Sequence, residues 1–422
     1  MALVYPHYVR RTKRWHLLVL ILGCISPFLA HSQVDPMPRE LIQLGYNASF
    51  QGHAPLAGYA FYYKNQPNFL QDSNLTLRLA VAPTYLDSEF GFSHLLGANT
   101  DLGVGVAGGG YADSYSEIRK GTYFPKESFD GYGGEASVSL YHCFNPNMQI
   151  PLNGVLRGSV HYATYANGGS TARDFDVPND ETTFVVRTGL RWGGKEPTLF
   201  PSLAMELSVW YEGEFRMNPD TYGFISATDP QGDRRTGPNS HLFWATALLA
   251  YTSTNSGRGF YVNLTAGTSV NADRFSAYRL GALLPLVSEF PLSLPGYYYQ
   301  EISARQFVLL GGNYIIPLDK KDRWNLNINA ATAGVDYLAG LQQPGDWLSG
   351  VGAGILYQTS SMKIMAGYAY GIDAIRSSGR GAHSVGILMQ FDLGHAKQSL
   401  LYPGELSRWR GWGRMFNGFF GQ

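Results

Sequence analysis

Apolar side chains recur at every second position over most of this chain. In residues 384–393 the alternation is regular, and the apolar positions are Val385, Ile387, Met389, Phe391 and Leu393. A period of two is typical of a β-strand with one apolar face. The same alternation occupies residues 42–50, 75–81, 184–192, 203–211, 260–266, 324–330 and 362–370. The pattern therefore predicts an all-β protein along its length.

The predicted strands are longer than those of most soluble sheets. Each runs about nine to twelve residues, whereas strands of soluble proteins are commonly about five or six residues long. A tilted membrane-spanning strand needs about 9–11 residues, and only a closed barrel leaves no unpaired sheet edge in lipid. About 360 residues at roughly 22 per strand and turn give about 16 strands. We therefore predict a transmembrane antiparallel β-barrel of about 16 strands.

The N-terminus has the order of a secretory signal peptide. Basic residues between positions 10 and 14 precede an apolar run over 17–30, and the small residues Ala30 and Ser32 suit a cleavage site. A retained membrane anchor and a lipoprotein box at residues 21–24 are the alternatives. We predict a signal peptide at 1–32, the barrel at 33–395 and a C-terminal tail at 396–422. An exported barrel is expected in the bacterial outer membrane.

Composition excludes some functions and leaves others open. The 422 residues include 50 Gly, 28 Tyr and 23 Phe, only 15% are charged, and the net charge is zero. No basic field is present for nucleic acid. Cys24 and Cys143 cannot form a disulfide once the signal is cut, so we interpret Cys143 as a buried small residue. We predict no cofactor and no metal; a calcium site at Asp220, Asp229 and Asp233 is the alternative.

Alternation assigns charged side chains to the face opposite the lipid. The predicted lumen-facing charges are Arg78, Glu135, Arg157, Arg187, Arg191, Glu206 and Glu212. One interpretation is that they pair across the barrel and keep it rigid, and the other is that they set the electrostatic preference of a pore. Aromatic residues at strand ends suit two interfacial girdles. These are Tyr162, Trp192, Trp210, Tyr211, Trp324, Trp347 and Tyr370.

Motifs for catalysis are weak. Residues 103–108 match G-x-G-x-x-G, but the sequence that follows is small and polar, so no helix end is there to bind phosphate and a strand is predicted instead. His142, His161 and Ser159 suggest a barrel hydrolase only if an orienting acid is present, and the sequence identifies none. We therefore predict that the protein is not an enzyme. Polar connections at 113–131, 167–181 and 217–240 are expected to be outward loops.

Residues 279–318 carry a family resemblance. They contain Arg-Leu-Gly-Ala at 279–282, Leu-Pro-Gly-Tyr at 294–297 and Gly-Asn-Tyr-Ile-Ile-Pro-Leu at 312–318, between strands predicted at 274–281 and 306–318. This segment resembles the bacterial surface antigen superfamily, the barrels of outer-membrane assembly and two-partner translocation proteins. The same barrel is attached to exported patatin-like phospholipases. No room is expected before residue 41 for the periplasmic or catalytic domains of those relatives, so their activities are not carried over.

The resemblance implies that loop 285–304 folds into the lumen. In the family, an arginine at the loop tip meets an acidic residue of the barrel wall. Here Pro295 and Asn313 occupy those two positions, and Gly296 follows the first. The loop would then be held by the packing and hydroxyl groups of three consecutive tyrosines, Tyr297, Tyr298 and Tyr299. The alternative is that these tyrosines belong to an interfacial girdle.

The C-terminal tail has aromatic residues at helical spacing. Trp409, Trp412, Phe416 and Phe419 are separated by arginines, which is typical of a segment in a membrane interface, although three glycines weaken a helix. An interfacial or lumen-entering tail is our hypothesis, with a disordered end as the alternative.

Three functions are consistent with these features. The leading one is a pore or a transport or binding barrel with an unidentified small-molecule permeant. The second is a stand-alone relative of assembly and translocation barrels that acts with a periplasmic protein partner. The third is a structural or surface-display protein that acts through its outer loops. Outer-membrane lipid is expected as a partner in all three, and nucleic acid in none.

Overall fold

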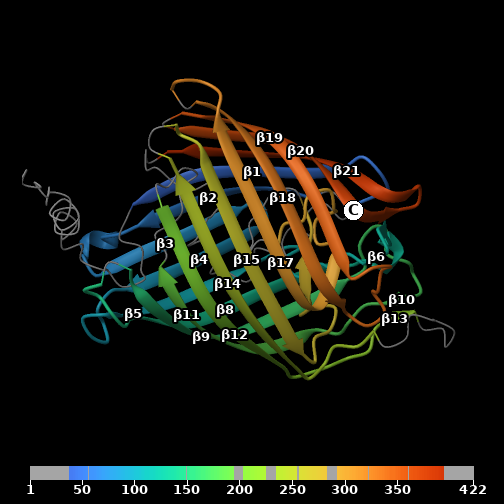
Figure 1. Ribbon diagram of the computed structural model, residues 1–422. Helices are drawn as coiled ribbons and strands as arrows, with labels where there is room; N and C mark the ends of the chain where they lie inside the picture. The colour runs from blue at the N-terminus through green and yellow to red at the C-terminus, as the bar shows by residue number, and fades with distance from the viewer. Residues whose placement is uncertain are drawn as a thin grey trace, which may run out of the picture.

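The computed structural model describes residues 38–55, 57–148, 150–193, 203–224, 234–253, 256–282, 292–321, 323–359 and 361–393. The predicted signal peptide, the 396–422 tail, Asp229 and Asp233 lie outside these ranges. The described chain forms one closed antiparallel barrel of 16 strands (Figure 1). Within the described ranges, no helix has the length and apolar character needed to cross a membrane.

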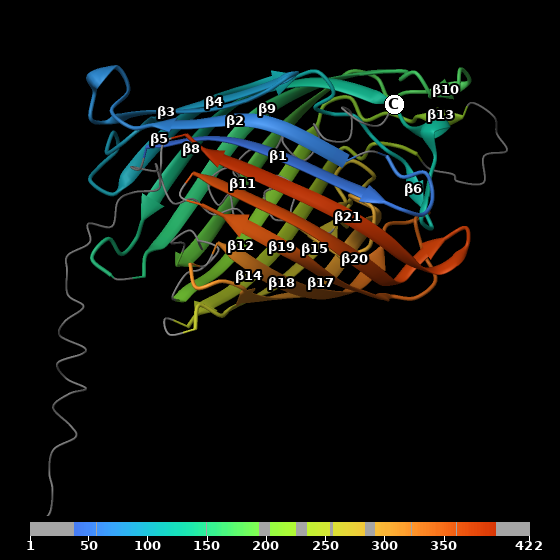
Figure 2. The same ribbon diagram turned by 90° about the horizontal axis from the view of Figure 1, so that it is seen from above.

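The wall consists of strands that each pair with the next one in the chain. In order they are β1 (Arg39–Ser49), β2 (Ala57–Gln66), β3 (Leu75–Ala82), β4 (Tyr85–Phe92), β5 (Thr100–Gly109), β8 (Asp130–Cys143), β9 (Leu152–Ala166), β11 (Glu181–Gly193), β12 (Leu203–Arg216), β14 (Asn239–Thr252), β15 (Gly259–Val270), β17 (Ile302–Pro317), β18 (Trp324–Tyr337), β19 (Trp347–Gln358), β20 (Met362–Arg376) and β21 (Gly379–Asp392). The last strand closes on the first through nine register pairs, from Leu41 opposite Asp392 to Ser49 opposite Ser384 (Figure 2). The predicted barrel of about 16 strands is confirmed.

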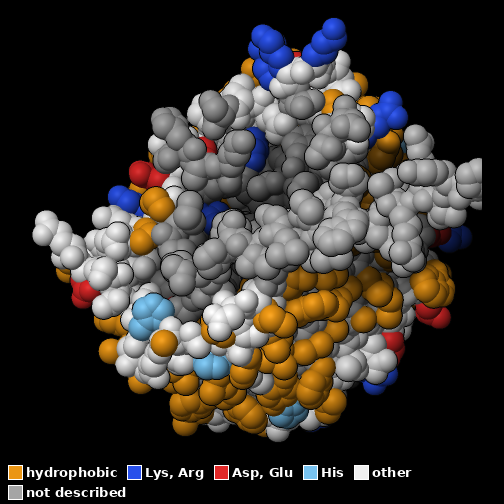
Figure 3. Space-filling model, turned by 60° about the vertical axis from the view of Figure 1, so that its left-hand side comes forward, with side chains coloured by type: hydrophobic (Ala, Val, Ile, Leu, Met, Phe, Trp, Pro, Cys, Tyr) orange, Lys and Arg blue, Asp and Glu red, His pale blue; other side chains and the backbone are white. Residues whose placement is uncertain are grey.

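Alternation separates an apolar outer face from an inner face of polar and small residues. On β11, Val186 and Leu190 are 40% and 44% exposed, while the side chain of Arg187 between them is 12% exposed. Because the barrel wall is one layer thick, a buried wall residue points inward. On the face that Figure 3 shows, hydrophobic side chains gather over the lower part of the described surface. The G-x-G-x-x-G segment lies in β5, as predicted, and Cys143 is buried, which confirms both interpretations.

Trp210 is not part of an outer girdle, contrary to the sequence-based prediction. Its ring stacks on Trp244, which is 7% exposed and points inward, with ring centroids 6.2 Å apart. A Cβ at the paired residue Gly189 would overlap the Trp210 ring, so the glycine provides the space for it. Trp192, Trp324 and Trp347 do lie on the outer face.

The four longest connections follow β5, β9, β12 and β15, which are the fifth, seventh, ninth and eleventh strands of the wall, so all four lie at the same end of the barrel. They span residues 110–129, 167–180, 217–238 and 271–301, and contain β6 (Ile118–Arg119), β7 (Thr122–Tyr123), β10 (Phe175–Asp176), β13 (Gly223–Phe224) and β16 (Tyr278–Leu280). The prediction of a wall strand at 274–281 is wrong. Only the short β16 forms there, because positive φ angles at Asn271, Gly281 and Ala282 turn the chain away from the wall.

Candidate functional site

The connection between β15 and β17 turns into the barrel. β16 pairs with the first residues of β17, and Gly281, at φ +150°, ends that pairing. The Gly281 N–H donates to the Leu292 carbonyl at 2.9 Å, and the Ala282 N–H donates to the Tyr298 carbonyl at 3.2 Å. These bonds bring both ends of the loop together. The side chains of its tip are buried, and Leu294 and Tyr297 are 0% exposed.

The loop tip lies directly against the backbone of the barrel wall. Gly350 on β19 and Gly371 on β20 are register partners with inward-facing positions. A Cβ at Gly350 would overlap the Pro295 carbonyl, and a Cβ at Gly296 would overlap the Gly371 nitrogen. Gly296 also has φ +88°, a conformation that favours glycine. Glycine on both surfaces therefore permits a backbone-to-backbone contact.

A buried ion pair holds the loop next to this contact. Arg376, the last residue of β20, donates to both carboxylate oxygens of Glu301 at 2.8 and 2.9 Å. Both side chains are 0% exposed. The Arg376 guanidinium lies 3.7 Å from the centroid of the Tyr298 ring, and the Tyr298 N–H donates to Glu301 at 2.7 Å. Removing one member of a buried pair costs about 3–5 kcal/mol, because it leaves the other charge uncompensated.

The three tyrosines contribute in different ways. The Tyr298 hydroxyl donates to the Gln51 carbonyl at 2.8 Å, which ties the loop to the β1–β2 connection. The Tyr299 hydroxyl accepts from the Gln300 amide at 3.0 Å. The Tyr297 hydroxyl is buried without a hydrogen-bond partner among the described residues, so Tyr297 holds the loop by packing alone. Burial raises the pKa of Tyr297 and of Tyr298, so both phenols are neutral at physiological pH.

Glu301 and Arg376 were not predicted from the sequence. The resemblance directed attention to Pro295 and Asn313, where the family's ion pair would stand. Pro295 lies at the wall contact. The Asn313 side chain faces inward on β17 opposite Asn329 and makes no hydrogen bond or ion pair within the described ranges. The observed pair has the opposite polarity, with the acid on the loop. Glu301 is the first charged residue after an uncharged run over 290–300, which could have marked it as special. Nothing in the sequence marks Arg376 in this way.

The seven predicted lumen-facing charges all lie on the inner face and are paired. The pairs are Arg78 with Glu89 at 3.0 Å, Arg157 with Glu135 at 2.7 Å, Arg191 with Glu206 at 3.0 Å, and Arg187 with Glu212. Each pair joins neighbouring strands rather than opposite sides of the barrel. Tyr141 on β8 also donates to Glu89 at 3.0 Å. The charges thus neutralise one another along the wall.

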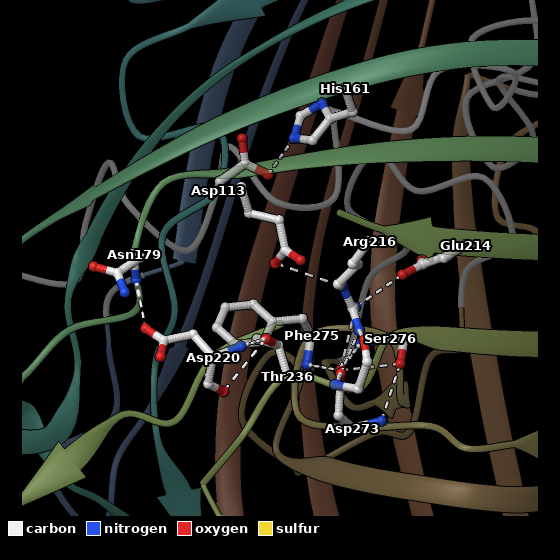
Figure 4. Close-up of polar contacts among 12 residues, drawn as sticks. Asp113, His161, Asn179, Glu214, Arg216, Asp220, Thr236, Asp273, Phe275 and Ser276 are labelled. Carbon is white, nitrogen blue, oxygen red and sulfur yellow. Dashed lines mark hydrogen bonds and ion pairs between the residues drawn. The ribbon is translucent and has the colours of Figure 1, made fainter. Parts of the chain in front are cut away.

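A second connection also enters the barrel, which corrects the prediction of an outward loop at 113–131. Residues 112–118 are all buried. Asp113 bonds His161, an inward residue of β9, at 3.0 Å. Figure 4 shows this contact beside Arg216, which pairs with Glu214 and Asp273. Glu117 pairs with Arg274 at 3.2 Å, which joins this segment to the connection between β15 and β17. The two inserted segments are therefore in contact.

Aromatic residues from four connections pack together above these segments. The cluster consists of Tyr115, Phe129, Phe175 and Tyr222, with Phe275 against it. Glu127 adds an ionic link, because it pairs with Arg119 at 2.6 Å and with Arg234 from the connection after β12. The other two predicted outer loops therefore contribute to a folded cap at this end rather than projecting separately.

The residues considered for catalysis or metal binding are arranged differently. Ser159 lies on the inner face but makes no hydrogen bond to His161, whose Nδ1 has no partner within the described ranges. His142 bonds the Thr100 hydroxyl at 2.8 Å. Asp220 accepts backbone N–H bonds from Asn179 and Thr221 (Figure 4). No group of three potential metal ligands occurs among the described residues.

These features define an outer-membrane-type β-barrel of 16 strands with a loop held inside it by a buried ion pair. The sequence matches no protein-family model and no curated protein sequence. Similarity to known proteins is therefore a matter of three-dimensional structure.

The solved neighbours are barrels of the surface antigen superfamily, which confirms the resemblance at the level of fold. CdiB from Acinetobacter baumannii superposes with a TM-score of 0.55 at 10% identity over 84% of this chain. BamA from Haemophilus ducreyi lacking POTRA domains 1–3 gives 0.51 at 12% over 83%, and CdiB from Escherichia coli 0.52 at 13% over 85%. The match spans 60%, 70% and 64% of the length of these neighbours, respectively.

Proposed function

We propose that this chain is an outer-membrane barrel that acts with a separate periplasmic protein to move a polypeptide or lipid across or into the outer membrane. One observation carries the proposal, the loop held inside the barrel by Glu301 and Arg376. This loop is in the position where the family resemblance predicts a lumen loop. The fold of CdiB and BamA supports the same class.

The loop also favours a partner-dependent barrel on physical grounds. A fully buried ion pair and a backbone contact fix the loop tip against the wall, so the loop does not shift freely with thermal motion. Passage along this side of the lumen then requires a molecule whose binding stabilises an alternative loop position. A ligand shifts such an equilibrium only by the difference between its affinities for the two states. A periplasmic partner loaded with its client is a suitable source of that difference.

A pore for small molecules is the second candidate function. It is favoured by the charged residues along β3 to β12, because charged linings influence which solutes pass. Their pairing between neighbouring strands reduces the net field, which weakens this candidate for ions.

The proposal is tested by deleting the gene and comparing the protein and lipid content of the outer membrane. We expect the deletion to lower the amount of at least one outer-membrane component. Wild-type protein should restore it and Glu301→Gln should not. Asp336→Asn is the matched control, because the Arg305–Asp336 pair is 54% and 47% exposed and lies on the outer face. Heat-dependent migration in gels checks that each variant is folded.

The opposite result has a clear form. An unchanged outer membrane after deletion, together with steady conductance steps from the purified barrel in planar bilayers, would support the pore instead. Cross-linking in living cells should also recover a periplasmic protein with the wild-type chain, and its recovery should change with Glu301→Gln.

A further inference from the structure

Glycines line a row across the inner face of the barrel. Along the register, Gly354 on β19 lies opposite Gly367 on β20, which lies opposite Gly386 on β21. Asn327 on β18 borders this row on one side and Asn47 on β1 borders it on the other. Four strand spacings of about 4.8 Å make the row about 19 Å wide. We call this surface, with Gly352, Asn329 and Ser384 from the next row, the glycine trough.

The side chains around the trough are buried but incompletely bonded. Asn327 and Asn47 are 2% and 5% exposed, and Ser384 is 1% exposed. The Asn327 Oδ1, the Asn47 Nδ2 and the Ser384 Oγ have no hydrogen-bond partner among the described residues. Buried polar atoms without a partner are costly. The trough therefore offers at least one acceptor and one donor to a ligand, which is the combination that a peptide group satisfies.

The protein already places a peptide backbone on the adjacent part of this wall. The next inward row toward the loop end contains Gly350 and Gly371, where Pro295 and Gly296 make their backbone contact. The trough continues the same surface toward the opposite end of the barrel, again without bulky side chains in its middle. A second extended segment of polypeptide fits there by the same physical principle.

We propose that the C-terminal segment of this chain, residues 394–422, enters the barrel and lies in the glycine trough. β21 ends at Asp392, six residues after Gly386, so the segment leaves the wall close to the trough. Its 29 residues reach about 95 Å when extended, far more than the ~20 Å needed to return to Gly386. Position and length both suit this occupant.

The sequence of the segment agrees with an extended docking mode. In an extended chain, alternate residues point to opposite sides. Gly411 and Gly413 then share one side, and the arginines at 408, 410 and 414 share the other. The glycine side approaches the trough closely, so that Asn327 and Asn47 bond its peptide groups. The arginine side faces the lumen and the carboxylates of the opposite wall.

Cysteine labelling in the folded, membrane-inserted chain tests the inference. Ser384→Cys in a Cys143→Ala background is labelled with a maleimide in the complete protein and in a variant lacking 396–422. We expect the complete protein to be protected and the shortened one to react faster. A synthetic 396–422 peptide should restore protection. Asn327→Ala and Asn47→Ala remove two hydrogen bonds to the peptide, so together they should weaken its binding to the shortened protein roughly tenfold or more.

Two controls keep the test decisive. Thr183→Cys on β11 faces inward on the other side of the barrel, and its labelling should not depend on the tail. If the shortened chain fails to fold, Gly411→Val with Gly413→Val in the complete chain should expose Ser384→Cys instead. Equal labelling with and without the tail overturns the inference, as does peptide protection that is unaffected by the two asparagine substitutions. It does not depend on the proposed partner, so either idea can fail alone.

Discussion

The two sides of the barrel interior differ in chemistry. The strands from β3 to β12, the charged wall, carry the inward pairs from Arg78–Glu89 to Arg191–Glu206. The strands from β14 through β21 to β1 and β2, the neutral wall, carry inward charges only at their ends. The two inserted segments contact one another, and the backbone contact of the loop tip, at Pro295 and Gly296, is with the neutral wall.

The difference shows two ways in which the inward-facing groups of a barrel wall find bonding and packing partners, since lipid contacts only the outer face. On the charged wall, charged side chains of neighbouring strands pair with each other, and the inserted Asp113 adds a bond to His161 on β9. On the neutral wall, glycines and small residues leave space, and another segment of the chain supplies the contacts. A wall braced by ion pairs between its own strands is expected to be rigid, whereas a wall whose glycines receive an inserted backbone provides a place where the barrel can change.

The largest effect is expected from breaking the pair that holds the loop to the neutral wall. Arg376→Met leaves Glu301 buried and unpaired, which should lower the free energy of unfolding by about 3–5 kcal/mol. Denaturant titration in detergent or lipid measures it. Arg305→Met is the matched control, since its exposed pair should contribute less than about 1 kcal/mol. Equal effects from both variants would mean that Glu301 and Arg376 do not fix the loop.

A smaller effect is expected from adding bulk at the loop contact. Gly371→Val places a side chain where Gly296 lies, and such overpacking costs about 1–3 kcal/mol. The loop should move away from the wall and become sensitive to added protease. Gly312→Val is the control on the same wall, because a Cβ there meets only the Tyr261 carbonyl, at 4.0 Å. If the loop stays protected from protease in Gly371→Val, the contact between Gly296 and Gly371 does not determine the position of the loop.

The sequence predicted the wall better than it predicted what the wall holds. Lipid outside and a one-layer sheet impose a period of two, so strand number and inward charges follow from local pattern. Trp210 is an even number of residues from Glu206 and Glu212, so the alternation already assigned it to the inner face. The prediction of an outer girdle position relied on its being aromatic instead. Glu301 and Arg376 are 75 residues apart, and no local period encodes a contact between a loop and a distant strand.

On the charged wall, smaller and pairwise effects are expected. A double-mutant cycle of Arg191→Ala and Glu206→Ala should give a coupling of about 1 kcal/mol, because the pair is close but not fully buried. The ratio of cation to anion conductance should stay unchanged in the double variant, because both charges are lost together. If the conductance ratio changes and the coupling free energy is zero, these residues select ions in a pore rather than stabilise the barrel wall.

The smallest effect concerns the cap that covers both walls, and it depends on pH. Burial alone would raise the pKa of Glu127, but Arg119 and Arg234 lower it below its ordinary value of 4.5. A lowered folded-state pKa means that the stabilisation is complete above the ordinary value and is lost as pH falls through the lowered one. Near-ultraviolet circular dichroism of the aromatic cluster should therefore weaken below about pH 4.5. Glu127→Gln should remove part of this dependence, and an unchanged pH profile would assign the transition to other carboxylates.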